Sequence, residues 1–445
     1  MARGSIMKTM DGKIKNFEEL AVTPMRRVAL ELVEAGLSAI DTPSVVRGAV
    51  KLDGDRIIIQ GRDYSPEEGG RIFVASVGKC ALEAAEVLEE ILGERVYKGV
   101  VIDVHEGKLR RMQSFTGDHP FPSERNILAT KALVRMLEET TERDLVIAIV
   151  SGGGSSLLCN PQNMTWEEEK DLVQHLFKKG APIEKINVIR KHLSLATGGY
   201  LAKYAYPARV VSLIFSDVPG DDIRYVASGP TVYDPTTVED AKKVFQEYDV
   251  EEECSAGERG LIETPKEEKY FARVENLLVT SNKIALEAMY RAAEERGFKA
   301  EIKTTRFDGE ARHVGAGIAQ ALALEPSGTF LLYGGESVVI LKTAGGKGGR
   351  NLELVLSALR FAKESDVVIS FSSDGRDNTE YAGAICDRIT REKAEKLGMD
   401  PREWLDRNDS FHFFEKTGDF LLTGETGSNV SDLVIAIRQR PERKR

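Results

Sequence analysis

Five short segments rich in glycine, serine and aspartate are the part of this sequence best suited to chemistry. They read SVGK (76–79), SGGGSS (151–156), SDVPGDD (216–222), GGES (334–337) and SSDGRD (372–377). Repeated small residues let a ligand approach the backbone closely, whereas a tight turn alone needs only one or two glycines. If the segments follow strands of one sheet, they predict a shared binding site at its edge.

Two cations are placed to hold an anion. Lys79 ends the first segment, and Arg350 ends the run GGKGGR (345–350) just before a helical stretch. In the 345–350 run, the backbone N–H groups, the positive end of the following helix and the cations Lys347 and Arg350 together favour an anion site. Lys79 is placed similarly, after a predicted strand and before a predicted helix over 81–92. Two alternatives remain open. Arg350 is on a flexible hairpin tip in solvent, or Lys79 is a surface charge.

Carboxylates gather in the same segments. Asp217 and Asp374 each stand next to a serine, immediately after a predicted strand. Magnesium prefers a few hard oxygen ligands and keeps waters for substrate phosphates, so these two residues are the candidate ligands. For Asp221 and Asp377, a turn or a helix cap is an equal alternative.

The named phosphate-binding and hydrolytic motifs are missing. A Walker A loop fails because Phe73 stands six residues before Lys79 and Cys80 follows it. Each pair of glycines that could begin GxGxxG lacks the third one, which argues against a nicotinamide dinucleotide site. There is no HxxxH or HExxH pair, and Ser155 lacks the GxSxG context. His119 is either a substrate contact or a structural histidine.

Composition narrows the class of protein. The 445 residues are 42% hydrophobic and 30% charged, a globular balance without an apolar run near the ~20 residues of a membrane span. The net charge of −10 disfavours a nucleic-acid-binding surface. The four cysteines (Cys80, Cys159, Cys254 and Cys386) lack CxxC or CxxH spacing, so we expect no zinc site and a cytoplasmic location.

Short runs rich in valine and isoleucine alternate with amphipathic helical stretches, which predicts an α/β fold with a doubly wound, mostly parallel sheet. We expect helices to begin at Pro24, after Thr165 and Thr237, and near Asn282. The expected strands are residues 72–77, 99–104, 145–150, 210–215, 277–280, 300–304, 329–333 and 367–371.

The length predicts two domains. The charged segment 251–269, which contains Pro265 and two glycines, is the expected junction. We therefore expect an N-terminal Rossmann-like α/β domain over 1–270 and a smaller C-terminal α/β domain over 271–445.

The chain from about Phe17 to Ile437 resembles the class II glycerate kinases, which carry a C-terminal MOFRL domain and were often labelled hydroxypyruvate reductases. Many long motifs occur in the same order as in that family. They are VGK (77–79), GDHPFPSE (117–124), SGGGSSLL (151–158), INVIRKHLS (186–194), SDVPGDD (216–222), SGPT (228–231), GEAR (309–312), GGES (334–337), GGRNLEL (348–354), SDGRDN (373–378) and TGETGSNVSDL (423–433).

The resemblance implies ATP- and Mg²⁺-dependent phosphorylation of D-glycerate in a cleft between the two domains, with Lys79 and Arg350 as catalytic cations. On this basis we expect Asp217 and Asp374 to be catalytic too, one holding Mg²⁺ and the other orienting the hydroxyl. The residues expected to line the nucleotide phosphates are Ser151, Gly152, Gly153, Gly154, Ser155, Ser156, Gly346, Gly348, Gly349 and Asn351.

Two other functions stay open. One is a nicotinamide-dependent reductase acting on hydroxypyruvate or tartronate semialdehyde, and the other is a non-catalytic module that binds a sugar phosphate. For the kinase we favour 2-phosphoglycerate over 3-phosphoglycerate as product, and the high Lys, Glu and Arg content favours a thermophile. We expect a small-molecule substrate, no nucleic acid and no membrane partner, and we leave a homodimer open.

Overall fold

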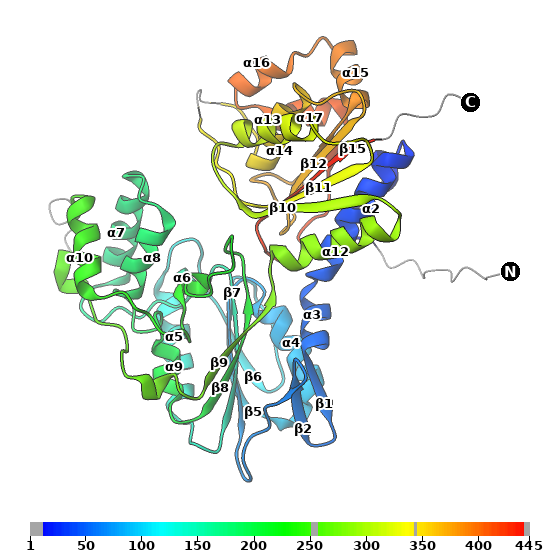
Figure 1. Cartoon of the computed structure of the whole chain (residues 1–445). Helices are drawn as coiled ribbons and strands as arrows, with labels where there is room; N and C mark the ends of the chain where they lie inside the picture. Colours follow the sequence, from blue (N-terminus) through cyan, green and yellow to red (C-terminus); the bar gives the residue numbers. More distant parts are fainter. Residues whose placement is uncertain (1–11, 251–256, 342–344, 440–445) are drawn as a thin grey trace. The chain divides into compact units, whose positions relative to one another are not determined.

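The computed structural model describes residues 12–250, 257–341 and 345–439 (Figure 1). The chain divides into two units. Unit 1 is Met1–Asp41 together with Asn282–Arg445, and unit 2 is Thr42–Ser281. Cys254 lies outside the described residues, as do the first six residues of the expected junction 251–269.

Unit 2 is built around a parallel sheet with the strand order β6-β5-β4-β7-β8-β9. Numbered in chain order, the strands follow the order 3-2-1-4-5-6, as in dinucleotide-binding sheets. Strands β5 and β6 are added on one side of β4 and strands β7 to β9 on its other side, so the switch point of the strand order lies between β4 and β7. The strands are β4 (Ile72–Val77), β5 (Val96–Asp103), β6 (Met112–Thr116), β7 (Leu145–Ser151), β8 (Arg209–Phe215) and β9 (Val274–Thr280).

Both faces of this sheet are buried. In β4, Ile72 and Val74 pack with one core, and Phe73, Ala75 and Val77 pack with the other. This alternation follows from the two-residue period of a strand, and it explains why the strands read as continuous apolar runs. Helices α3 (Thr42–Ala49) and α4 (Ala81–Leu92) cover the first face, and α5 (Glu124–Leu137) and α9 (Tyr200–Ala205) cover the second (Figure 1).

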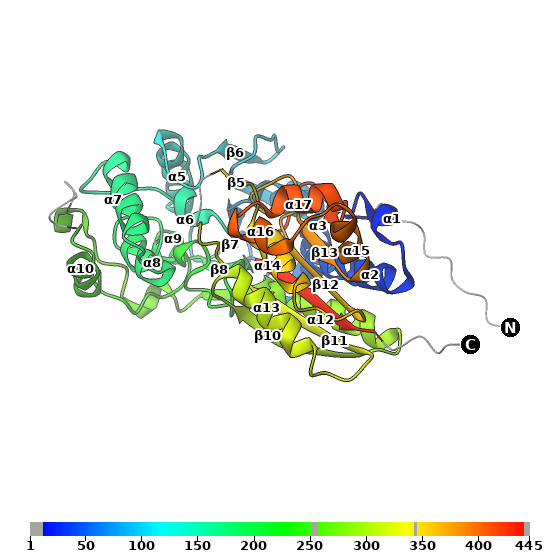
Figure 2. The ribbon, with the colours of Figure 1, turned by 90° about the horizontal axis from the view of Figure 1, so that it is seen from above.

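A separate helical cluster extends unit 2. Helices α7 (Trp166–Lys178), α8 (Ile183–Lys191) and α10 (Val238–Glu247) bury their apolar faces against one another, and both ribbon views show them side by side (Figures 1 and 2). The expected helix starts after Thr165 and Thr237 are confirmed, because both residues form capping boxes. The small antiparallel sheet β1 (Val50–Asp53), β2 (Arg56–Ile59) and β3 (Arg62–Asp63) completes the unit.

Unit 1 contains a mixed sheet with the order β10-β11-β15-β12-β13-β14. Strand β15 (Asp432–Arg438) runs antiparallel to both β11 (Thr329–Gly335) and β12 (Asp366–Ser372), so the carboxyl ends of β11 and β12 meet the start of β15. The remaining strands are β10 (Lys299–Phe307), β13 (Gly383–Cys386) and β14 (Phe420–Leu421).

Helices cover both faces of this sheet as well. Helices α2 (Pro24–Ala39) and α12 (Asn282–Glu295) pack on one face, and α13 (Ala311–Leu322), α14 (Arg350–Leu359) and α17 (Ser410–Thr417) pack on the other (Figure 1). The remaining helices are α1 (Phe17–Leu20), α15 (Arg388–Lys396) and α16 (Pro401–Asp406).

The units divide the chain differently from the expected 1–270 and 271–445. Strand β9 still pairs in parallel with β8, so the later boundary falls at Ser281 rather than at 270. Residues up to Asp41 belong to unit 1 because α2 buries Leu30, Val33 and Leu37 in the same core as α12. Helix α12, against which α2 packs, lies about 250 residues further along the chain, so the local sequence pattern around α2 could not indicate this pairing.

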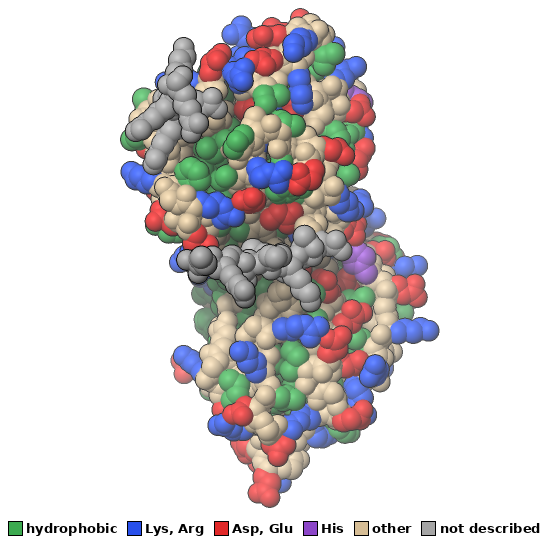
Figure 3. Space-filling view, turned by 90° about the vertical axis from the view of Figure 1, so that its right-hand side faces the viewer, with side chains coloured by type: hydrophobic (Ala, Val, Ile, Leu, Met, Phe, Trp, Pro, Cys, Tyr) green, Lys and Arg blue, Asp and Glu red, His purple; other side chains and the backbone are tan. Residues whose placement is uncertain are grey.

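The face of the molecule shown in Figure 3 is mixed in charge. On the face drawn in Figure 3, acidic and basic side chains alternate without a broad area of one sign among the residues described there. None of the helices in the described residues has both the length and the apolar character needed to cross a membrane.

Candidate active site

The switch point of the parallel sheet brings two of the predicted segments together. Lys79 follows β4 and Gly152 follows β7, and the Lys79 N–H donates to the Gly152 carbonyl at 2.9 Å. Ligands of open α/β sheets bind beyond the carboxyl ends of the strands at this reversal. The structure therefore places Lys79 and the SGGGSS segment where a ligand site is expected.

Asp217 and His119 reach the same turn. A Cβ atom on Gly152 would lie 2.0 Å from Asp217 Oδ2, and one on Gly153 would lie 3.0 Å from Lys79 Cγ and 3.2 Å from His119 Cδ2. A side chain on Gly152 would displace Asp217, and Gly153 adopts a φ of +84°, which residues other than glycine rarely adopt. The backbone of Gly152 and Gly153 is thus in close contact with a lysine, a carboxylate and an imidazole.

The six residues of the SGGGSS segment differ in access. Gly153 and Ser155 keep partly exposed surface, whereas Ser151, Gly152, Gly154 and Ser156 are buried. Ser151 Oγ lies 3.4 Å from both the Val77 carbonyl and the Cys80 N–H, so it ties the end of β7 to the end of β4. Direct phosphate contact by the six residues stays a prediction, and Gly153 and Ser155 are best placed for it.

The loop after β8 can accommodate a cation. The buried Oδ1 atom of Asp221 has no hydrogen-bond partner in the described residues, and it belongs to the same loop as Asp217. By contrast, Asp222 is paired with Arg224 at 2.5 Å. No cluster of three or more histidine, cysteine or acidic side chains able to hold a metal occurs in the described ranges. A site with one or two carboxylates fits Mg²⁺ that is also bound to phosphate and water.

A hydrogen-bonded chain links the turn to α8. Ser228 Oγ lies 2.8 Å from both Ser155 Oγ and Asn187 Oδ1. Arg190 follows Asn187 by three residues, so both side chains lie on the same face of α8. Partial desolvation and the charges of Lys79 and Arg190 lower the pKa of His119 from its usual 6.5, which favours the neutral imidazole.

In unit 1, Arg350 is held by two carboxylates. Its Nε donates to Asp432 Oδ2 at 2.5 Å and its Nη2 to Asp432 Oδ1 at 3.1 Å, while Nη1 donates to Glu336 Oε1 at 2.6 Å. Glu336 follows β11 and Asp432 begins β15, so the guanidinium lies at the sheet edge where these strand ends meet. The Arg350 side chain is 27% exposed, which leaves it accessible to a ligand.

Arg350 and Asp432 shift each other's pKa. Burial would lower the pKa of the Arg350 guanidinium, but the charges of Asp432 and Glu336 outweigh it and raise that pKa. Burial raises the pKa of Asp432 to about 7 against the opposing pull of Arg350. The arginine therefore stays charged, and its fork is fixed by a buried carboxylate.

The glycines of the 345–349 run mainly contact the protein itself. A Cβ atom on Gly346 would lie 2.2 Å from the Arg407 carbonyl, one on Gly348 would lie 2.3 Å from Ser410 Oγ, and one on Gly349 would lie 2.0 Å from the Asp377 carbonyl. Their small size is thus required by packing. Phosphate binding by these glycines stays a prediction.

Asn351 and Asp377 are buried supports of this cluster. Asn351 is 1% exposed, and its side chain bonds to Asp377, Asp432 and Ser370. The Asp377 carboxylate accepts from the Asn351 and Leu352 N–H groups, so it caps the start of α14. Nucleotide contact by Asn351 stays a prediction, and the structure shows it holding the carboxylate that holds Arg350.

Asp374 lies in the loop after β12 and is partly exposed. Its Oδ1 accepts from Ser372 Oγ at 2.8 Å and from the Arg376 N–H at 2.9 Å. These bonds fix one carboxylate oxygen. This geometry fits a predicted magnesium ligand or hydroxyl-orienting group, a role that the structure leaves as a prediction.

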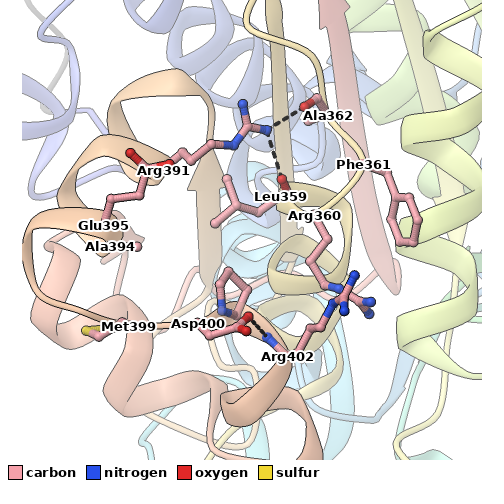
Figure 4. A pocket seen from close by; sticks show the side chains of 11 residues that line it. Leu359, Arg360, Phe361, Ala362, Arg391, Ala394, Glu395, Met399, Asp400 and Arg402 are labelled. Atoms are coloured by element: carbon pink, nitrogen blue, oxygen red, sulfur yellow. Dashed lines mark hydrogen bonds between the residues drawn. The ribbon is translucent and has the colours of Figure 1, made fainter.

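A hollow of about 530 Å³ lies elsewhere on unit 1 (Figure 4). Residues near the end of α14 line it, including Arg360, and Arg391 donates to the carbonyls of Leu359 and Ala362 there. The end of α14 is about 14 Å along the helix axis from Arg350. This hollow is separate from the candidate site.

Comparison with known proteins identifies the family. Residues 28–263 match a family model described as a domain of unknown function, DUF4147, and residues 329–432 match the MOFRL family model. A glycerate 2-kinase from Pyrococcus horikoshii is 40% identical over 435 residues, which are 93% of this chain and 97% of the relative. This chain belongs to the class II glycerate kinase family.

Two further relatives extend the comparison. The crystal structure of a glycerate kinase from Thermotoga maritima has a TM-score of 0.82 and 34% identity, covering 93% of this chain and 99% of that one. A protein from Agrobacterium vitis named a putative hydroxypyruvate reductase is 37% identical over 384 residues, which are 82% of this chain and 86% of the relative.

Three residues of this glycerate kinase family member escaped the sequence analysis. Arg190, Ser228 and Asp432 each lie inside a motif that carried the family resemblance, namely INVIRKHLS, SGPT and TGETGSNVSDL. Their neighbours in space are far away in the sequence, so no spacing rule assigned them a role. The motifs themselves were the available signal.

Proposed function

We propose that this protein catalyses the Mg²⁺-dependent transfer of the γ-phosphoryl group of ATP to D-glycerate, giving 2-phosphoglycerate. The observation that carries the proposal is the meeting of Lys79, the Gly152–Gly153 turn and Asp217 at the switch point of the sheet. Phosphoryl transfer depends on positioning and on stabilising charge, for which a cation, backbone N–H groups and a carboxylate suffice. The name of the Pyrococcus relative supports the 2-position.

In this reaction the 2-hydroxyl oxygen of glycerate bonds to the γ-phosphorus. The bond to the β–γ bridging oxygen breaks, ADP leaves, and the hydroxyl proton passes to a carboxylate, for which Asp217 and Asp374 are the candidates. The Lys79 side chain lies beside the partly exposed Gly153, where its charge would balance negative charge on the phosphoryl oxygens. Magnesium, when bound, neutralises charge on the nucleotide phosphates, and whichever of Asp217 and Asp374 does not orient the hydroxyl would hold it.

Arg350 can bind an oxyanion without giving up its carboxylate partners. A guanidinium has five N–H donors, and the bonds to Asp432 and Glu336 use three of them. Two donors remain for a glycerate carboxylate or a phosphoryl oxygen. We propose that Arg350 and Lys79 act in the same reaction.

The reductase alternative has one structural point in its favour, the strand order of unit 2. The protein's own atoms, however, fill the places where a dinucleotide would bind. A Cβ atom on Gly78, in the turn after β4, would lie 1.9 Å from Ser151 Oγ, so this turn is packed against β7. Asp103, at the end of β5, accepts from the Leu82 and His105 N–H groups and is 2% exposed, so it cannot bind a ribose.

One experiment separates the two activities and the two products. Purified protein is given D-glycerate, ATP and MgCl₂, and ³¹P NMR identifies the phosphate ester. We expect the resonance of 2-phosphoglycerate to grow together with that of ADP. Oxidation of NADH or NADPH by hydroxypyruvate without ATP would support the reductase and contradict the kinase, and a 3-phosphoglycerate resonance would contradict the proposed position.

We also propose a cytoplasmic location. The cysteines in the described residues, Cys80, Cys159 and Cys386, are free and buried, which supports a reducing compartment.

A further inference from the structure

Two cations without an ion-pair partner act on the His119 ring, which lies against the Gly152–Gly153 turn. Within the ranges that the structure describes, neither the Lys79 ammonium nor the Arg190 guanidinium forms a hydrogen bond or an ion pair. The charges of both act on His119, whose ring lies against Gly153. Like charges repel each other, and an anion that binds between the two cations relieves this repulsion.

Helix α8 fixes the backbone position of Arg190. Ile186 and Ile189 are buried in the core formed with α7 and α10. On the face that carries Arg190, Asn187 connects through Ser228 to Ser155 of the SGGGSS segment. The part of α8 that carries Arg190 is therefore fixed relative to the glycine turn, as expected for a ligand-binding residue on a rigid element.

The acidic group that acts on Arg190 electrostatically does not form an ion pair with it. Glu169 on α7 influences Arg190 electrostatically, but no ion pair within 4.0 Å joins the two. The Glu169 carboxylate is 4% exposed and lies 3.3 Å from the Cys159 thiol. Glu169 is therefore held within unit 2 by its own contacts, and the Arg190 guanidinium keeps its N–H donors for a ligand.

We propose that Arg190, Lys79 and His119 form an oxyanion-binding site over Gly153, in which Arg190 supplies the forked contact, Lys79 the second charge and the His119 ring a hydrogen bond. Its ligand is a carboxylate or a phosphate group. This inference rests on the proposed function for the source of that group, which is either glycerate or the nucleotide. No assignment from the sequence included Arg190.

The test compares Arg190→Gln with Arg190→Lys and with the control Arg135→Gln, which removes an exposed charge on α5 of the same unit. For each variant, KM for D-glycerate, KM for ATP and kcat are measured, and calorimetry records the binding of inorganic phosphate. Losing a charged hydrogen bond weakens binding roughly 10–100-fold, so we expect this rise in one KM for Arg190→Gln. Arg190→Lys should lose less, and Arg135→Gln should match the parent protein.

A rise in KM for D-glycerate assigns the site to the carboxylate, and a rise in KM for ATP with weaker phosphate binding assigns it to the nucleotide. Unchanged KM values and phosphate affinity in Arg190→Gln, within about twofold, would overturn the proposal. If Arg190→Gln does not fold, unchanged values in Arg190→Lys decide against it. Absence of glycerate phosphorylation by the parent protein would refute only the proposed function, because phosphate calorimetry still tests the site.

Discussion

Lys79 and Arg350 are both cationic, but they are held in opposite ways. Arg350 is fixed by the buried Asp432 and by Glu336, whereas Lys79 has no ion pair in the described part of the chain. A fixed guanidinium is ready for a ligand of one geometry, and an unpaired ammonium can follow charge as it moves. We therefore assign the changing charge of the transition state to Lys79.

Lys79→Ala should lower kcat by about 10²–10³, because removing one well-placed donor to a developing charge has that effect. Steady-state kinetics with D-glycerate and ATP measure it. Lys178→Ala on the exposed end of α7 is the matched control and should keep the parent rate. A Lys79→Ala protein with near-parental kcat would exclude this role.

Glu169 should make stability depend on pH. Burial raises its pKa from 4.5 to about 7, against the opposing effects of the Cys159 thiol and Arg190. The folded state therefore binds a proton more tightly than the unfolded state, and stability is lost as the pH rises from about 4.5 through 7.

Glu169→Gln removes this penalty. Relative to the parent, it should gain stability between pH 5 and pH 8, by up to about 3 kcal/mol. Urea denaturation at both pH values measures the change in the free energy of unfolding. If the difference in unfolding free energy between Glu169→Gln and the parent does not grow from pH 5 to pH 8, Glu169 ionises normally.

The sequence predicted the positions around Lys79 better than those around Arg350. Lys79, Gly152 and Asp217 each follow a strand of one parallel sheet, and the rule that such strand ends meet brought them together. The glycines at 346, 348 and 349 pack against Arg407, Ser410 and Asp377, and a glycine pattern cannot distinguish packing from ligand binding.

At the level of elements, all eight predicted strands are confirmed, and strands buried on both faces, such as β4, β7 and β12, have the clearest pattern. Strand β6 (Met112–Thr116) escaped because it lies at the sheet edge and reads MQSFT. Strand β15 was also missed, although it is buried at the centre of its sheet.

Helix α2 is attached to unit 1 by a buried ion network. Arg26 is 0% exposed and bonds to Asp387 at 2.6 Å and to Asp419 at 2.7 Å. Its neighbour Arg27 pairs with Glu18 on the surface. The two adjacent arginines therefore form a natural comparison of a buried pair with an exposed one.

Arg26→Ala should cost about 3–5 kcal/mol of unfolding free energy, because it leaves two buried carboxylates without their cation. Arg27→Ala should cost less than about 1 kcal/mol. Guanidinium denaturation of both variants gives the comparison. Equal effects would mean that Asp387 and Asp419 find other partners, such as Lys393 near Asp419.

For the whole molecule, the main organising fact is that unit 2 is one continuous segment and unit 1 is made of two. Unit 2 runs from Thr42 to Ser281, with its own sheet and cores on both faces. Unit 1 needs residues before Asp41 to cover the sheet face beside α12.

A fragment of residues 42–281 should therefore fold alone and melt cooperatively, as circular dichroism can show. A fragment of residues 282–445 should aggregate in size-exclusion chromatography, because Leu286 and Met289 lose their cover from α2. Adding residues 12–41 as a separate peptide should restore a monodisperse peak. Failure of 42–281 to melt cooperatively would contradict the division.

The split of unit 1 also affects how the chain folds while it is being synthesised. Helix α2 leaves the ribosome early, but β15, at the centre of the sheet it covers, is made about 400 residues later, roughly 20–80 s at 5–20 residues per second. During that interval the nascent chain carries an amphipathic helix with an uncovered apolar face, a natural client for a chaperone. Unit 2 can complete its folding meanwhile, so translation itself sets the order of assembly.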